Sequence, residues 1–186
     1  LESLVGYVDT LDEHALQRYT HRLHQVVYAA AGFYAGDIHV ARQFGLAVFF
    51  SGDNKSGSAA FRAASSAWLI HAVCRELESH MSLSLKISMA IAQSELGVGD
   101  GGDIYPGLYM QHTLDELQAV SSSTPPGLML AQAVAEDIDV ASRLSHQPTD
   151  VGGYVSVAEF ASTYHDLLER QLRLIMRRLT DPTQLH

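Results

Sequence analysis

Three aspartates in the first part of the chain carry the chemistry needed to bind a divalent cation. Asp9 follows a short apolar segment, and Asp37 and Asp53 flank a second apolar stretch. Carboxylate oxygens are the ligands that Mg²⁺ prefers. Asp9 together with Asp37 or Asp53 is therefore one arrangement that could hold a single cation. We predict no metal site and no cofactor. Among the three aspartates, Asp9 is the only candidate for a metal ligand.

A glycine-rich segment over residues 97–107 could offer backbone amides to a phosphate. The glycines concerned are Gly97, Gly99, Gly101 and Gly102. Exposed amides of such loops can bind phosphate, but no Lys-Ser or Lys-Thr pair follows, as a P-loop requires. We expect a loop rich in turns and keep phosphate binding as an alternative.

Histidine and cysteine give little sign of a reactive centre. His14, His21 and His24 lie on one predicted helix, where we expect surface or boundary positions because a zinc site usually needs more ligands. Cys74 is the single cysteine of the chain, which excludes an internal disulfide and a cysteine metal cage. It lies in an apolar helical stretch, so we expect a buried, inert thiol.

The elements that must position these residues follow from hydrophobic periodicity. Helical spacing predicts helices over residues 12–31 (ended by Gly32), 58–80, 108–120 and 158–179. Short apolar or alternating runs predict strands over residues 4–9, 38–41, 46–50, 83–92, 127–131 and 154–157, the second and third forming a hairpin. The order indicates an α+β fold: one antiparallel-containing sheet, helices packed on it, and a C-terminal helix. We divide the chain into residues 1–150 and a terminal strand and helix, residues 151–186.

The C-terminal helix carries an apolar stripe bordered by arginines. The stripe consists of Phe160, Tyr164, Leu168, Leu172, Ile175 and Leu179. Packing on the same domain is the first expectation, and an interface with a second copy or a partner domain is the alternative. A membrane-surface role is the least favoured interpretation.

Composition restricts the partners. The 186 residues suffice for one domain with a core, and the net charge of −9 disfavours nucleic acid, which needs clustered Lys and Arg. No apolar run is long enough for a membrane span. Because the chain begins with Leu1, we expect a segment of a longer, cytoplasmic or membrane-anchored protein.

The order of elements and several short motifs resemble the catalytic domain of class III adenylyl and guanylyl cyclases over roughly residues 3–137. Tyr7-Val8-Asp9 matches the end of the family's first strand, and Gln43-Phe44-Gly45 stands where its hairpin has Gly-Asp-Gly. The later matches are the alternating strand before Gly97, then Tyr105 and Gly107 before a helix, then Pro126-Gly127 before a short strand. The resemblance implies a ferredoxin-like βαββαβ core.

The differences from that family concern the catalytic positions. Its members hold two cations on two aspartates; Asp9 matches the first, and Phe44 stands at the second. The family's catalytic helix carries Asn and Arg, where this chain has Gln111 and Asp115. An aspartate there would repel the phosphates that an arginine stabilises.

The resemblance therefore implies a catalytically inactive domain and not an enzyme. We expect a regulatory or dimerisation module of a larger, bacterial signal-transduction protein, since the family works as dimers. Two alternatives stay open: a live nucleotide-binding or cyclase domain with a rearranged site, and an unrelated α+β domain that binds a small ligand or a protein.

Overall fold

The computed structural model describes residues 13–41, 45–79, 87–93, 113, 115–117, 119, 120 and 127–180. These residues form an α+β fold with two sheets and three long helices. The predicted strand at residues 4–9 and the glycine-rich loop lie outside the described residues.

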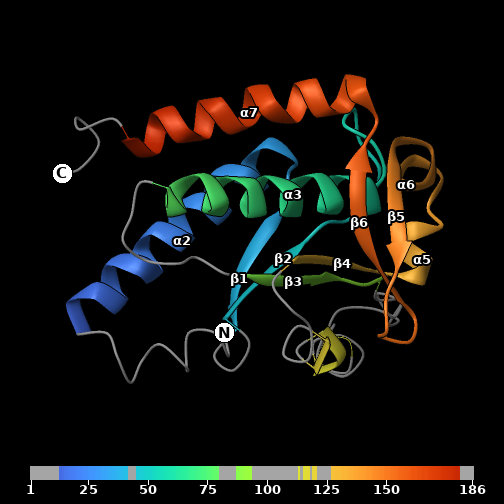
Figure 1. Ribbon diagram of the computed structural model, residues 1–186, viewed down its shortest axis with the longest axis horizontal. Helices are drawn as coiled ribbons and strands as arrows, with labels where there is room; N and C mark the ends of the chain where they lie inside the picture. The colour runs from blue at the N-terminus through green and yellow to red at the C-terminus, as the bar shows by residue number, and fades with distance from the viewer. Residues whose placement is uncertain are drawn as a thin grey trace, which may run out of the picture.

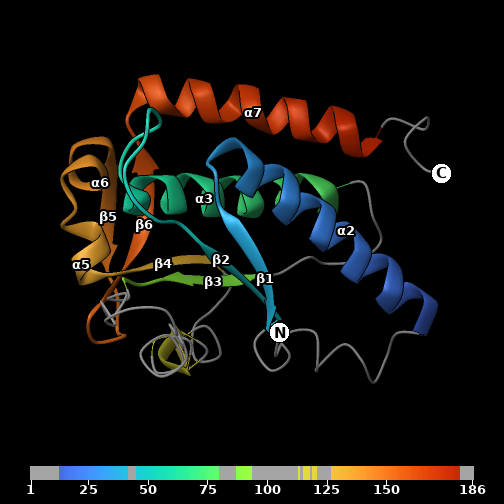
Figure 2. The same ribbon diagram turned by 180° about the vertical axis from the view of Figure 1, so that it is seen from behind.

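The three long helices are α2 (Glu13–Phe33), α3 (Ala59–Glu78) and α7 (Ser162–Thr180). They pack against one another, and both views show α3 between α7 and the strands β3 and β4 (Figures 1 and 2). This central position explains the composition of α3, in which alanines and other small residues allow close approach on both sides. Twelve residues of α3 are buried, Leu69 and Val73 completely.

The first sheet is the predicted hairpin. Strand β1 (Asp37–Ala41) pairs antiparallel with β2 (Gly45–Phe49), from Asp37 opposite Phe49 to Ala41 opposite Gly45. The connection therefore consists of residues 42–44. Both strands were predicted to within one residue, because two short segments rich in strand-forming residues lie close together in the sequence.

The second sheet has four strands in the order β3-β4-β6-β5. Strand β3 (Ser88–Ile91) runs parallel to β4 (Gly127–Ala131), and β6 (Tyr154–Phe160) is antiparallel to β4 and to β5 (Leu144–Pro148). The described strands thus form two sheets where we predicted one. Residue 150, our proposed boundary, lies in the loop between the paired strands β5 and β6.

Two short helices, α5 (Gln132–Ala135) and α6 (Ile138–Arg143), join β4 to β5. The Asp137 carboxylate caps α6 by accepting from the backbone amides of Asp139 and Val140, at 3.0 and 3.2 Å. It also accepts from the Ser58 hydroxyl at 2.7 Å, and Ser58 is itself the N-cap of α3. One carboxylate therefore ties the first turns of two helices together.

Three element predictions need correction. Helix α2 continues through Gly32, and Ala35, with φ of 54°, takes the left-handed conformation after its end. Helix α7 begins at Ser162 and not at Ala158, because Glu159 and Phe160 pair with β5. Strand β5 and both short helices were not predicted; Leu144–Pro148 contains none of the β-branched or large aromatic residues that are enriched in strands.

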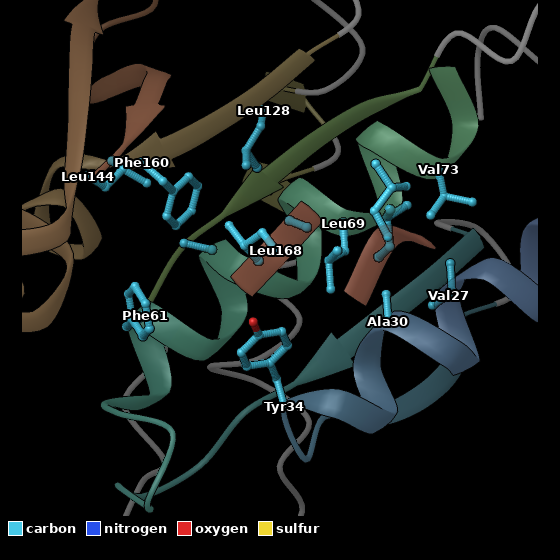
Figure 3. Close-up of a cluster of buried hydrophobic side chains, with 14 of the residues drawn as sticks. Val27, Ala30, Tyr34, Phe61, Leu69, Val73, Leu128, Leu144, Phe160 and Leu168 are labelled. Carbon is cyan, nitrogen blue, oxygen red and sulfur yellow. The ribbon is translucent and has the colours of Figure 1, made fainter. Parts of the chain in front are cut away.

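The core consists of apolar side chains from all three long helices and from the strands β4, β5 and β6 (Figure 3). Its fully enclosed members include Ala30, Leu69, Val73, Leu130 and Ile175, each 0% exposed. Among the described residues, no helix combines the length and the hydropathy that a bilayer crossing requires.

Candidate functional site

Most residues of the predicted cyclase-like site lie outside the described part of the chain. This holds for Asp9, Phe44 and Gln111, and for Gly97, Gly99, Gly101 and Gly102. Asp115 is described and lies exposed in a helical stretch. The neighbouring Glu116 accepts a hydrogen bond of 2.8 Å from the hydroxyl of Tyr154, which attaches this stretch to β6.

The described residues do not complete a cation site around Asp37 or Asp53. Asp37 lies at the open end of the hairpin, opposite Phe49 and away from the turn. Asp53 is exposed in the loop after the hairpin. Within the described ranges, no cluster of three or more His, Cys, Asp or Glu residues could hold a metal ion.

Arg62 is the most deeply buried charged residue in the described structure, with 1% of its surface exposed. Its Nη1 donates to the Tyr34 carbonyl at 3.0 Å, and its Nη2 donates to the carbonyls of Ser51 and Gly52. The Phe50 ring centroid lies 5.9 Å from the guanidinium carbon. The side chain thereby connects the end of α2 and the loop after the hairpin to α3.

A hollow of about 440 Å³ lies beside this connection, between the end of α2, the loop 54–57, the start of α3, Arg143 of α6 and one face of α7. We call it the α2–α7 hollow. Figure 3 shows Tyr34 at the end of α2 and Phe61 at the start of α3, with the Tyr34 hydroxyl directed toward the helix that carries Leu168.

Arg143 forms one wall of the hollow. Its guanidinium carbon lies 4.7 Å from the Phe61 ring centroid and 4.8 Å from that of Tyr164. Its Nη2 lies 3.2 Å from a carboxylate oxygen of Asp139, one helical turn earlier. Two aromatic faces and one carboxylate therefore fix the orientation of this cation.

Gly57 lies directly against this wall. It adopts a φ of 119°, which L side chains rarely take, and a Cβ there would come within 2.9 Å of the Phe61 ring and 3.1 Å of Arg143 Nη1. Only glycine fits this position without displacing the ring or the guanidinium.

The polar end of the hollow is formed by Tyr34, Gln171 and Ser65. The Tyr34 hydroxyl donates to Gln171 Oε1 at 2.7 Å, and burial raises the pKa of Tyr34 above its ordinary value. The Ser65 hydroxyl lies close enough to affect that pKa, yet it has no well-formed hydrogen bond to any described residue.

The apolar stripe of α7 is covered by the same chain. Leu168, Leu172, Ile175 and Leu179 are buried, and Tyr164 is partly buried with its ring against that of Phe61. Phe160, which we placed on the same stripe, is buried at the end of β6. Helix α7 contacts α3 and α2, so this stripe is not a free surface for a partner. The large apolar residues of α7 that stay exposed are Leu167 and Leu174.

Cys74 is buried as expected, and burial raises its pKa to about 12. The thiol therefore stays protonated at pH 8, and we expect no measurable reaction of the native protein with Ellman's reagent, while the urea-unfolded chain reacts fully. Because the folded pKa is the higher one, the contribution of this thiol to stability is complete below pH 9 and declines between pH 9 and 12. Rapid labelling of the folded protein would contradict the burial.

Sequence reasoning missed the residues that line the hollow. Arg62 was the one residue whose sequence context could have indicated this region. It is a charged residue among Ala60, Phe61 and Ala64, on a helix predicted to pack closely in the core. An arginine at such a position predicts a structural partner or a site. Arg143 and Gln171 gave no comparable signal, because their surroundings depend on elements distant in sequence.

Comparison of the chain with protein-family models, with curated proteins and with solved structures finds no match.

Proposed function

We propose that this chain is a catalytically inactive, nucleotidyl-cyclase-like domain that serves as a regulatory or dimerisation module. It would belong to the cytoplasmic part of a larger, signal-transducing bacterial protein. The succession α2, β1, β2, α3 and β3 supports this proposal, because a ferredoxin-like βαββαβ core has the same order after its first strand.

The observation that carries the proposal is the register of the hairpin. Ala41 pairs with Gly45, so the connection consists of Arg42, Gln43 and Phe44. The family places a metal-binding aspartate at this turn, and residues 38–49 contain no acidic residue. A shift of the alignment by two positions in either direction therefore supplies no carboxylate, and the second cation ligand is missing.

Restoring the carboxylate tests the proposal. Wild-type protein should show no change in melting temperature with Mn²⁺ and ATP or GTP. Phe44→Asp, which recreates the pair with Asp9, should gain a Mn²⁺-dependent rise of about 2–4 °C, because ligand binding stabilises the native state. Differential scanning fluorimetry measures both.

Gln43→Asp is the matched control, since it adds the same charge one residue away and should gain no response. A nucleotide-dependent shift in the wild type would instead support the live site. A Phe44→Asp variant without any response would count against the cyclase alignment. Light scattering tests the dimer separately: we expect about twice the 20.3 kDa chain mass, and a monomer would refute that part.

A further inference from the structure

We propose that the α2–α7 hollow binds a small organic anion with a flat, apolar body. This inference does not depend on the cyclase-like assignment, because it uses none of the positions on which that assignment rests. The volume of the hollow, about 440 Å³, lies within the range of roughly 300–1,000 Å³ that is typical of small-molecule sites.

The charge of the lining selects an anion. Lys55 and Arg143 are its ionised residues, and no carboxylate lines it, although the chain as a whole carries a net charge of −9. Asp139 already balances Arg143, whereas Lys55 forms no ion pair with any described residue. An anionic group at the mouth could therefore meet an ammonium without an ion pair, and a guanidinium whose salt bridge to Asp139 leaves other N–H groups as donors.

The walls of the hollow suit a flat apolar body. The rings of Phe61 and Tyr164 lie 5.4 Å apart, centroid to centroid, in an edge-to-face arrangement that is locked by Arg143. Leu167 and Leu168 continue this wall along α7. Rings and aliphatic side chains held in this way need little rearrangement to receive a planar ligand.

The closed end of the hollow contains the polar groups of Tyr34, Gln171 and Ser65. Ser65 is 0% exposed and lines the hollow, and its hydroxyl lies near the Tyr34 hydroxyl without a well-formed hydrogen bond to any described residue. Buried hydroxyls normally have a partner, because an unpaired one costs free energy. Because the chain itself encloses the Ser65 hydroxyl, a ligand that reaches this end would contact the Gln171 amide of the Tyr34–Gln171 pair and not Ser65.

Fluorescence titration with anilinonaphthalene sulfonate tests the proposal, since this probe combines a flat aromatic body with one anionic group. We expect saturable binding with one site per chain. N-phenylnaphthylamine has the same ring system without the sulfonate, and it should bind at least about tenfold more weakly if the charge is recognised.

Matched variants locate the site. Lys55→Met should weaken sulfonate binding about three- to fivefold, whereas Arg173→Met removes the same charge elsewhere on the surface and should have no effect. Leu167→Trp places a large ring at the rim and should abolish binding, while Leu174→Trp, one heptad further along α7, should not.

Circular dichroism of each variant verifies that the fold is intact. Absence of saturable binding, equal binding of the two probes, or binding that survives Leu167→Trp in a folded protein would each overturn the proposal. Failure of this test would leave the Phe44→Asp result unaffected, so the two proposals can fail separately.

Discussion

Replacing Arg62 with methionine is expected to lower the free energy of unfolding by about 3 kcal/mol. The methionine keeps most of the apolar volume but loses the guanidinium that bonds the carbonyls of Tyr34, Ser51 and Gly52. The Tyr34 carbonyl belongs to a buried residue, so it would lose its partner without gaining water. Urea denaturation followed by circular dichroism measures the change.

Arg75→Met on the same helix is the control, because Arg75 is exposed and should change stability by less than about 0.5 kcal/mol. Removing a buried charge also removes its desolvation cost, which acts in the opposite direction. If Arg62→Met proved as stable as the wild type, desolvation would outweigh the three hydrogen bonds, and the connecting role of Arg62 would be wrong.

Truncating Ile175 to alanine is expected to destabilise the protein by about 3 kcal/mol, because a fully enclosed side chain leaves a cavity when it is shortened. Ile175 is 0% exposed and belongs to the core cluster shared by α2, α3 and α7. Thermal and urea unfolding of Ile175→Ala measure the loss.

The same variant distinguishes packing within the chain from packing against a second copy. The destabilisation should be independent of protein concentration, because α7 packs on its own chain. Leu174→Ala, next to it but 45% exposed, should change stability by less than about 1 kcal/mol. A loss of stability in Ile175→Ala that itself changes with protein concentration, relative to the wild type, would indicate that the stripe stabilises a dimer instead.

Local sequence patterns predicted the described elements best where periodicity and boundary signals agree. Ser58 before an alanine-rich helical run predicted the start of α3, and two closely spaced β-rich segments predicted the hairpin between β1 and β2. Two predictions failed in the second half of the chain for the same reason: strand β5 was missed, and the start of α7 was placed too early. Residues 144–148 and 158–160 have weak strand character, and only their mutual pairing makes them strands.

For the candidate site, the contrast between what the sequence determined and what the tertiary structure decided is stronger. The sequence by itself determined the absence of a carboxylate near the hairpin turn, the single cysteine and the negative net charge, because these are properties of the residues themselves. The tertiary structure alone decided that Lys55, Phe61, Arg143 and Gln171 line one hollow. Their positions span more than a hundred residues, and no local periodicity records which distant side chains will meet when helices pack.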